Sequence, residues 1–487
     1  MNEGPKSIWR SPKFYLLGLA GLLVLIGLFY AEEDWRGSYA WNRFKHQWEA
    51  KGERFNLASV IPPAVPDDQN FALTPVVASC YGNVLDPNGH QISPPNTNVV
   101  NQLNMEIPPG TAKGIGNWQK ATMSKLESPA SDVLSTLSKY DSAIAELREA
   151  AKLPESRFPL NYNNDPPAAI LLPHLAALKK CAQVLQLRAI AELQNDQSDL
   201  ALADVKLGIQ LTGKIRTEPF LISHLVRIAM VNLTLQPIWE GLARHQWSDA
   251  QLTELEHELG RLNFPADYEF TMRGERALDI GNTEYLRRTH KFDLMSNAGN
   301  PRSSPSVQNF VLCLMPNSWF YQNELAVARM HQQWILPSVD VEHQMISPEA
   351  VHRNEAAETN ELSRLAFYDV FACMLFPALS PAARRFAFAQ ESADLARVAI
   401  ALERYRLAHG DYPDSLDALA PQFIAKLPHD IINGQPLHYR RAGDGQFVLY
   451  SVGWNETDDD GEVVLNKGAS PTVNLNEGDW VWKYPAQ

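Results

Sequence analysis

The feature that most constrains this chain is a stretch near its N-terminus, residues 14–30, that contains no charged side chain. As a helix rising about 1.5 Å per residue, it would span about 25 Å, slightly less than the hydrocarbon core of a bilayer. Aromatic residues stand at both ends of the stretch, as they do at the two interfaces of a membrane. The sequence therefore predicts a single transmembrane helix over residues 14–30, in contact with the lipid bilayer.

The charges on either side of this stretch predict its orientation. Lys6, Arg10 and Lys13 precede it, whereas three acidic residues follow at positions 32–34. Because the positive flank stays in the cytoplasm, residues 1–13 form a cytoplasmic tail and the bulk of the chain lies outside, in the periplasm of a bacterial inner membrane. The alternative is a cleaved signal peptide, but the bulky Phe29 does not suit the small-residue pattern of a cleavage site.

Length, charge and cysteine content narrow the class of protein. The 487 residues suffice for two to four domains. The net charge of −13 and the lack of a basic stripe argue against nucleic acid as a partner, since phosphate contacts need clustered cations. Cys80, Cys181, Cys313 and Cys373 are widely separated and form no CxxC motif. They are either buried small apolar residues or disulfide partners in an oxidising compartment.

Residues 31–130 form a juxtamembrane and Pro/Asn-rich irregular region, and residues 131–380 form an α-helical domain. Within that domain, residues 185–211 predict one helical hairpin, which resembles a single tetratricopeptide unit and does not recur as an array. Residues 248–264 predict a helix capped by Ser248 or Asp249. Prolines near the end of the domain are expected to break the helices before residue 382.

Residues 381–487 predict an α+β domain. A long helix is expected from about residue 382 to residue 409, where Gly410 suits the cap. The alternation around Leu437 and Tyr439 predicts a half-buried strand, which a turn at residues 444–445 joins to a partner strand. The predicted fold class is therefore mainly α, with a C-terminal α+β domain in which a long helix covers a small antiparallel sheet.

A series of motifs follows the long helix in a fixed order. These are Gly-Asp-Tyr-Pro at 410–413, Leu-Pro-His-Asp at 427–430, Gly-Gln-Pro-Leu-His-Tyr at 434–439 and Phe-Val-Leu-Tyr-Ser-Val-Gly at 447–453. In this order, residues 382–465, under a fifth of the chain, resemble the periplasmic domain of the major pseudopilins of type II secretion systems. Two departures matter: the anchor lies far from this helix, and no prepilin-peptidase signature precedes Phe14. The chain is therefore expected to use the module for packing or docking, not as a pilin subunit.

The resemblance implies a calcium-binding loop after the second strand. Calcium takes several hard oxygen ligands, and the residues that offer them here are Asn455, Asp458, Asp459 and Asp460. The alternative is a solvated acidic turn. The run is not an EF-hand, because the full ligand set and the terminal Glu are missing.

Two other patterns bear on chemistry. The pairs Glu254/His257 and Glu349/His352 have the Glu-x-x-His spacing of di-iron bundles, but the first pair falls off its helix's leucine stripe and is expected to face solvent. Residues 208–215 nearly spell a phosphate-binding loop. Ile215 replaces the required Ser or Thr and the segment is helical, so no nucleotide is expected.

The leading functional expectation is non-catalytic, and no catalytic residue is assigned. It is a membrane-anchored periplasmic scaffold or protein-interaction protein with envelope proteins as partners, associated with type II secretion or pilus-like machinery. The main alternative is a periplasmic metal-dependent enzyme that uses the Glu-x-x-His pairs. A third is ligand capture by the Pro-rich aromatic region, for which the sequence offers no substrate.

Overall fold

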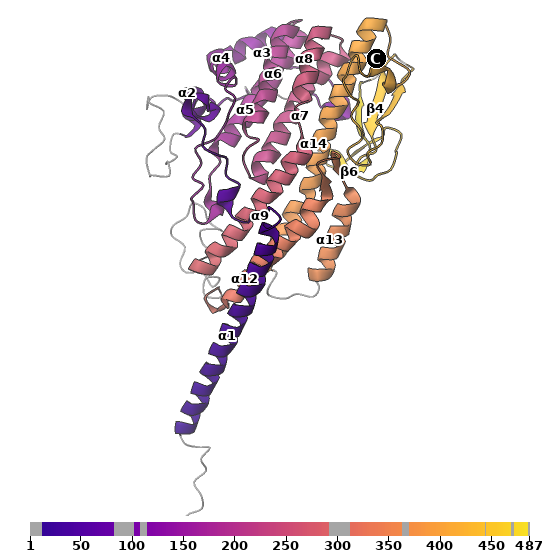
Figure 1. Ribbon diagram of the computed structural model, residues 1–487. Helices are drawn as coiled ribbons and strands as arrows, with labels where there is room; N and C mark the ends of the chain where they lie inside the picture. Colours follow the sequence, from indigo (N-terminus) through magenta and orange to yellow (C-terminus); the bar gives the residue numbers. More distant parts are fainter. Residues whose placement is uncertain are drawn as a thin grey trace, which may run out of the picture.

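The structure is a computed structural model that describes residues 12–81, 102–107, 114–291, 312–362, 370–443, 445–468 and 472–485. It is mainly helical with a small antiparallel sheet region, as the sequence predicts. A long N-terminal helix projects from a body of packed helices, and the sheet lies at the end of the body far from that projection (Figure 1).

Helix α1, Pro12–Glu49, is one unbroken helix with two different halves. Side chains of its first half are exposed, as the 66% exposure of Tyr15 and the 65% exposure of Leu25 show. The second half packs on the body, where Trp41 and Phe44 are buried in a cluster with Leu325. The exposed half is a candidate membrane span or signal sequence.

Helices of the body follow in chain order. The longer ones are α3 Ala130–Leu137, α4 Asp141–Ala150, α5 Pro173–Gln194, α6 Ser198–Lys214, α7 Leu221–Ala243, α8 Asp249–Leu259, α9 Phe264–Thr289, α12 Asn317–Met330, α13 Pro348–Leu362 and α14 Val370–His409. Short helical turns are α2 Pro75–Ala78 and the segments Leu57–Ser59, Asp67–Gln69, Phe71–Leu73, Ser79–Tyr81, Trp118–Lys120, Ser138–Tyr140, Pro167–Ala169, His331–Ile335, Leu336–Ser338 and Leu416–Leu419. Helix α7 is also long and apolar enough to cross a membrane, but most of it is buried in the core.

Local sequence explains the clearest helices. α5 and α6 form the predicted hairpin, with Ala189 and Ala201 fully buried between them. Ser248 caps α8, since its side chain accepts from the Gln251 N–H while the Gln251 side chain accepts from the Ser248 N–H. α8 ends at Leu259, earlier than predicted, because Asn263 caps a new helix.

The strands form three small antiparallel groups. β3 His438–Arg441, β4 Phe447–Ser451 and β7 Trp480–Lys483 make a three-stranded sheet in the order β3-β4-β7. β5 Val463–Leu465 pairs with β6 Val473–Gly478, and β1 Val339–Asp340 pairs with β2 Met345–Ile346. The predicted β3–β4 hairpin is present, with Tyr439 opposite Leu449. Of its predicted turn only Gly445 is among the described residues, at φ +78°.

Helix α14 corrects one expectation. It begins at Val370 and continues through Pro377 and Pro381 to His409, so the predicted break before residue 382 is wrong. Each proline removes one backbone donor, but burial of one face, including Leu379 and Ala382, stabilises the helix across them. The predicted cap at Gly410 is confirmed, with φ +90° and its N–H donating to the Arg406 carbonyl over 2.8 Å.

Two large apolar cores hold the body together. One lies among α3–α6 and the segment at residues 71–81, and the other joins α7, α8, α9 and α14 to the three-stranded sheet. Aromatic rings connect the sheet to the helices, since Trp118 stacks on Phe388 and contacts Trp482. The Trp239 Nε1–H donates to the Lys483 carbonyl over 3.1 Å. The sheet therefore shares its core with the helical region.

The cysteines form no disulfide among the residues described. Cys181 is fully buried, Cys80 is partly buried and Cys313 is exposed, and all three are free. Burial raises the pKa of the Cys80 and Cys181 thiols to about 12. These two are therefore apolar packing residues, and the Cys373 side chain lies outside the described part.

Candidate functional site

The acidic loop that the sequence singled out follows β4 and lies beside β3. The Asp458 carboxylate accepts from the Tyr450 hydroxyl over 3.1 Å, and its other oxygen lies 3.3 Å from His438 Nδ1. The Asn455 amide donates to Asp459 over 2.9 Å. Asp460 lies 3.5 Å from Arg440 Nε. Each carboxylate of the loop thus faces a different protein group.

A further carboxylate lies beneath this loop. Asp479, which is 1% exposed, accepts from the Gly461 N–H over 2.7 Å and from the Asp459 N–H over 3.3 Å. Burial raises the pKa of Asp479, and the neighbouring charges of Asp459 and Asp458 raise it further. Asp479 therefore holds the acidic loop in place by accepting from backbone N–H groups of that loop. The sequence did not reveal this role, because Asp479 is not adjacent to the loop in the chain.

In the described part of the chain, no group of three or more His, Cys, Asp or Glu side chains is arranged to hold a metal ion. The predicted ligands Asn455, Asp458, Asp459 and Asp460 are brought into one turn, where each contacts another protein group. The geometry observed is that of an internally bonded acidic turn.

The two Glu-x-x-His pairs lie on the surface of separate helices. On α8, Glu254 pairs with Lys206 over 2.6 Å and the His257 side chain is 73% exposed. On α13, the Glu349 side chain is 78% exposed and lies 3.5 Å from Arg353. The expectation that the first pair faces solvent is confirmed, and neither pair approaches the interior of a helix bundle.

The segment that resembles a phosphate-binding loop is the last part of α6, which ends at Lys214. Gly208 lies inside this helix, tight against Thr234 of α7. A phosphate-binding loop needs consecutive free backbone N–H groups, and a continuous helix engages them. The segment therefore has no such cradle.

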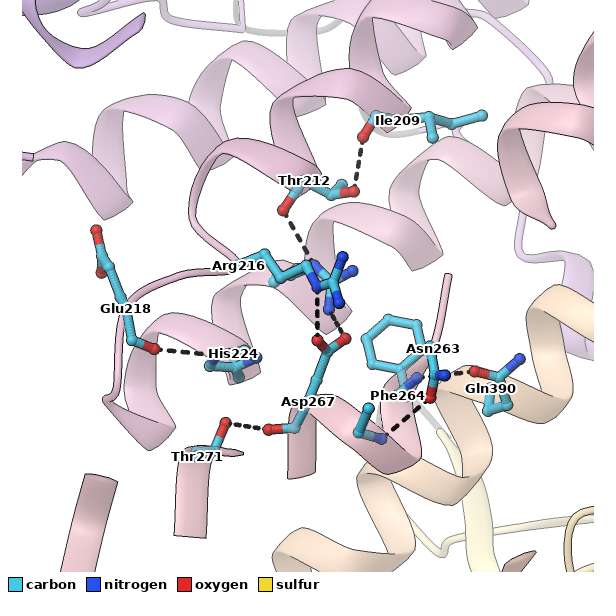
Figure 2. A network of polar contacts seen from close by, with 12 residues as sticks. Ile209, Thr212, Arg216, Glu218, His224, Asn263, Phe264, Asp267, Thr271 and Gln390 are labelled. Carbon is cyan, nitrogen blue, oxygen red and sulfur yellow. Dashed lines mark hydrogen bonds and ion pairs between the residues drawn. The ribbon is translucent and has the colours of Figure 1, made fainter. Parts of the chain in front are cut away.

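A buried polar cluster lies where α6 ends and α9 begins (Figure 2). Arg227 of α7 is 1% exposed and donates from Nε to the Thr212 carbonyl over 3.0 Å and from Nη1 to Asp267. Arg216 donates to the other Asp267 oxygen over 3.0 Å. The guanidinium of Arg227 thereby satisfies a carbonyl at the C-terminal end of α6, which has no partner within its own helix.

Asp267 is placed where its charge is favourable. It lies in the first turn of α9, near the positive end of the helix dipole, and is 2% exposed. The Asn263 side chain caps the same turn by accepting from the Ala266 N–H over 3.0 Å, and Gln390 of α14 accepts from the Phe264 N–H over 2.9 Å (Figure 2). The Arg–Asp cluster thus joins α6, α7 and α9, and the Gln390 hydrogen bond adds α14.

A second buried group surrounds Glu218, in the loop before α7. One oxygen accepts from the Ser223 hydroxyl and the other lies 2.6 Å from His174 Nε2. In a catalytic triad the histidine stands between the hydroxyl and the carboxylate, whereas here the carboxylate is in the middle. Burial lowers the pKa of the neighbouring His224 to about 4, with a further contribution from Arg227. The arrangement is therefore not that of a catalytic triad.

Sequence reasoning missed these buried clusters. Arg227 and Asp267 are forty positions apart, on different helices. One local signal was available: Arg227 is a charged residue on the face of α7 that is buried in the core. No family model, curated protein or solved structure matches this chain. The resemblance of residues 382–465 to pseudopilins therefore stays a prediction from motifs.

Proposed function

We propose that this chain is a non-catalytic scaffold or protein-interaction protein, anchored in the bacterial inner membrane by residues 14–30, with its body in the periplasm. The observation that carries the proposal is the continuity of α1 from its exposed apolar half into its packed half. Exposed leucines along the whole first half would be costly in water, whereas a bilayer covers them.

The joint between anchor and body supports a scaffold rather than a tethered domain. The Asp34 carboxylate accepts from the Ser318 N–H over 2.8 Å and so caps the first turn of α12, whose own cap position is a proline. The Tyr30 hydroxyl donates to the Leu314 carbonyl over 2.7 Å. Gly37 lies so close to Ser318 that an added Cβ would be 2.8 Å from its Cα. The body is thus fixed to the anchor within two turns of the apolar stretch.

The proposed partners are envelope proteins of type II secretion or pilus-like machinery. Support comes from the motif order of residues 382–465 and from the position of the sheet, which lies beside α14 in the part of the body away from the exposed half of α1 (Figure 1). An anchored body of this shape presents the sheet region away from the bilayer. The Glu-x-x-His pairs lie on the surface, so nothing in their geometry favours the metal-dependent enzyme.

The test is crosslinking in intact cells, followed by purification of the full chain in detergent and identification of crosslinked proteins. The matched control is the same body exported without its anchor. The proposal expects secretion or pilus-like components to be enriched with the anchored chain and reduced with the unanchored one. Enrichment of no envelope assembly, or metal-dependent turnover of a substrate by the purified chain, would contradict it.

Calcium binding by the acidic loop is a separate proposal, supported by the resemblance and by the oxygen-rich composition of the loop. In the structure Asp458 accepts from Tyr450 and Asp459 accepts from Asn455, and calcium would bind beside these contacts or displace them. A ligand that binds only the folded state at a hundredfold excess over Kd stabilises it by about 2.7 kcal/mol. Thermal unfolding of the full chain in calcium should then exceed that in chelator by a few degrees, and Asp458→Asn should abolish the difference. Equal thermal midpoints in calcium and in chelator would contradict calcium binding by the loop.

A further inference from the structure

We propose that two adjoining basic cavities beside the Arg–Asp cluster bind a small soluble molecule that carries two or more anionic groups, such as phosphates. The cavities lie between the C-terminal end of α6, the loop before α9 and the segment that follows α1. This proposal concerns a site that the scaffold function does not require.

The first cavity has a volume of about 440 Å³. Five cationic side chains line it, against two acidic ones. The cations are Lys152, Lys214, Arg216, Arg227 and Arg261, and the acids are Glu155 and Glu258. In a chain with a net charge of −13, this concentration of positive charge is local to the cavity. A concave site with one sign of charge focuses the potential and raises the local concentration of oppositely charged ligands.

The second cavity, about 850 Å³, adjoins the first. Four residues line both cavities, namely Pro154, Gly213, Arg216 and Thr217. The second cavity adds the cations Lys51, Arg54 and Arg273 and the acids Glu53 and Asp267. Both volumes are in the range of small-molecule sites.

Carboxylates of the protein do not fully neutralise these cations. Asp267 is shared by Arg216 and Arg227, and Glu53 is shared by Arg273 and Arg276, which lie 3.1 and 2.7 Å from it. Arg273 also pairs with Glu269 over 3.1 Å, so three carboxylates serve these four guanidinium groups. Because each guanidinium presents five donors in a planar fork, these arginines keep donor capacity for a ligand.

Lys214 of the first cavity has a backbone carbonyl, not a carboxylate, as its hydrogen-bond partner. Its ammonium donates to the Leu153 carbonyl, and within the described part of the chain no carboxylate forms an ion pair with it. Burial lowers its pKa below the ordinary value. The Ser156 hydroxyl lines the same cavity, is 8% exposed and has no hydrogen-bond partner among the described residues. A phosphate group in the cavity would give the Ser156 hydroxyl an acceptor and the Lys214 ammonium an anionic partner.

The position of the site favours a soluble ligand over a lipid headgroup. Lys51 lies twenty-one residues beyond the end of the apolar stretch, and α1 continues as a helix to Glu49. At 1.5 Å per residue, the site is about 30 Å from the edge of the hydrocarbon core, whereas headgroups reach only about 5–8 Å. The preference for a soluble ligand rests on the proposed membrane anchor, whereas the inference of an anionic ligand rests on the cations of the cavities alone.

The experiment uses the full chain in nanodiscs of neutral lipid, with inorganic pyrophosphate as the probe and sodium chloride of equal ionic strength as the reference. Titration calorimetry is expected to show saturable binding by the native chain. Lys214→Gln should weaken it by about tenfold, since it removes a charged donor. Arg261→Gln should weaken it by about threefold, because that side chain is 69% exposed. The control Lys426→Gln, an exposed lysine outside both cavities, should leave the affinity unchanged.

Three results would overturn the proposal. The first is no binding of pyrophosphate beyond the chloride reference. The second is an affinity for pyrophosphate that is unchanged in both Lys214→Gln and Arg261→Gln. If Lys214→Gln fails to fold, Arg261→Gln alone provides this test, because the exposed Arg261 can be changed without disturbing the fold. The third is binding to anionic-lipid nanodiscs that pyrophosphate displaces, which would make the ligand a headgroup. If crosslinking finds no envelope partner but pyrophosphate binds, the scaffold proposal is wrong and the anion-site proposal stands.

Discussion

Asp267 is the residue on which the buried charge cluster depends, because Arg216 and Arg227 share its carboxylate. Removing that charge leaves Arg227 buried without a counterion, a change that costs about 3–5 kcal/mol. Asp267→Asn should therefore lower the stability of the full chain by that amount in denaturant unfolding followed by circular dichroism. The control is Asp249→Asn, since Asp249 pairs with Arg404 over 2.7 Å but its side chain is 58% exposed. Asp249→Asn should lower the free energy of unfolding by less than about 1 kcal/mol. An equal loss of stability in the two variants would contradict a special role for Asp267.

Glu275 and Asp279, one turn apart on α9, predict a pH dependence. Burial raises the pKa of Glu275 to about 8 and that of Asp279 to about 7, and the charge of Asp279 also raises the pKa of Glu275. Between about pH 5 and pH 8 the folded state thus binds more protons than the unfolded state, so stability falls as the pH rises. Glu275→Gln keeps an acceptor for the Leu221 N–H, which now donates to Glu275 over 2.5 Å.

Glu275→Gln should therefore raise the thermal midpoint at pH 8 by a few degrees and change it less at pH 5. Glu284→Gln is the control, because Glu284 lies on the same helix with its side chain 52% exposed. Parallel pH profiles for the native chain and Glu275→Gln would show that this carboxyl is ionised in the folded protein. His331, whose pKa burial lowers to about 3, lies 3.9 Å from Asp279 and is neutral over this range.

What the sequence reveals of a site depends on how local the site is. Asn455 and Asp458 stand in one short run, so the order of residues alone is enough to predict an acidic loop. The carboxylate beneath that loop, Asp479, stands between β6 and β7, and no local pattern connects it to the loop. The basic cavities likewise combine side chains from residues 51–273, and only the fold brings them together.

Among the elements, α12 depends on α1. The first turn of α12 has no cap of its own, and Asp34 supplies one from the neighbouring helix. Loss of a capping side chain costs about 0.5–2 kcal/mol. Asp34→Ala should speed hydrogen exchange at the amides of the first turn of α12, while Glu32→Ala, which changes an exposed residue two positions earlier, should not. Unchanged exchange in Asp34→Ala would contradict the fixed joint.

Elements whose bounds are set by neighbouring residues in the sequence were predicted better than elements whose bounds are set by tertiary contacts. The α5–α6 hairpin and the caps at Ser248 and Gly410 follow from periodicity and capping chemistry. The continuation of α14 through Pro377 was missed, because packing outweighs the local cost of a proline. β7 was also missed, since Trp480, Val481 and Trp482 are all buried, so the strand shows no alternation of apolar and polar residues.

At the scale of the whole molecule, the sheet and the helices form one folding unit. The sheet contributes Trp482 to the core that contains Trp118 of an early segment and Trp239 of α7. A fragment of residues 381–487 would expose those aromatic faces to water and lose about 25 cal/mol for each Å² of apolar surface left uncovered. It should show no cooperative thermal transition, whereas the full chain should. A cooperative melt of the fragment would mean that the sheet folds on its own helix alone.

The central claim is that residues 14–30 anchor the chain in the inner membrane and place the body in the periplasm. The most direct measurement is protease digestion of spheroplasts and of inverted inner-membrane vesicles, after extraction in alkaline carbonate shows whether the chain stays with the membrane. The account predicts a carbonate-resistant chain whose body is digested in spheroplasts and protected in inverted vesicles. Digestion in inverted vesicles only, or a soluble chain that has lost its first thirty residues, would contradict it.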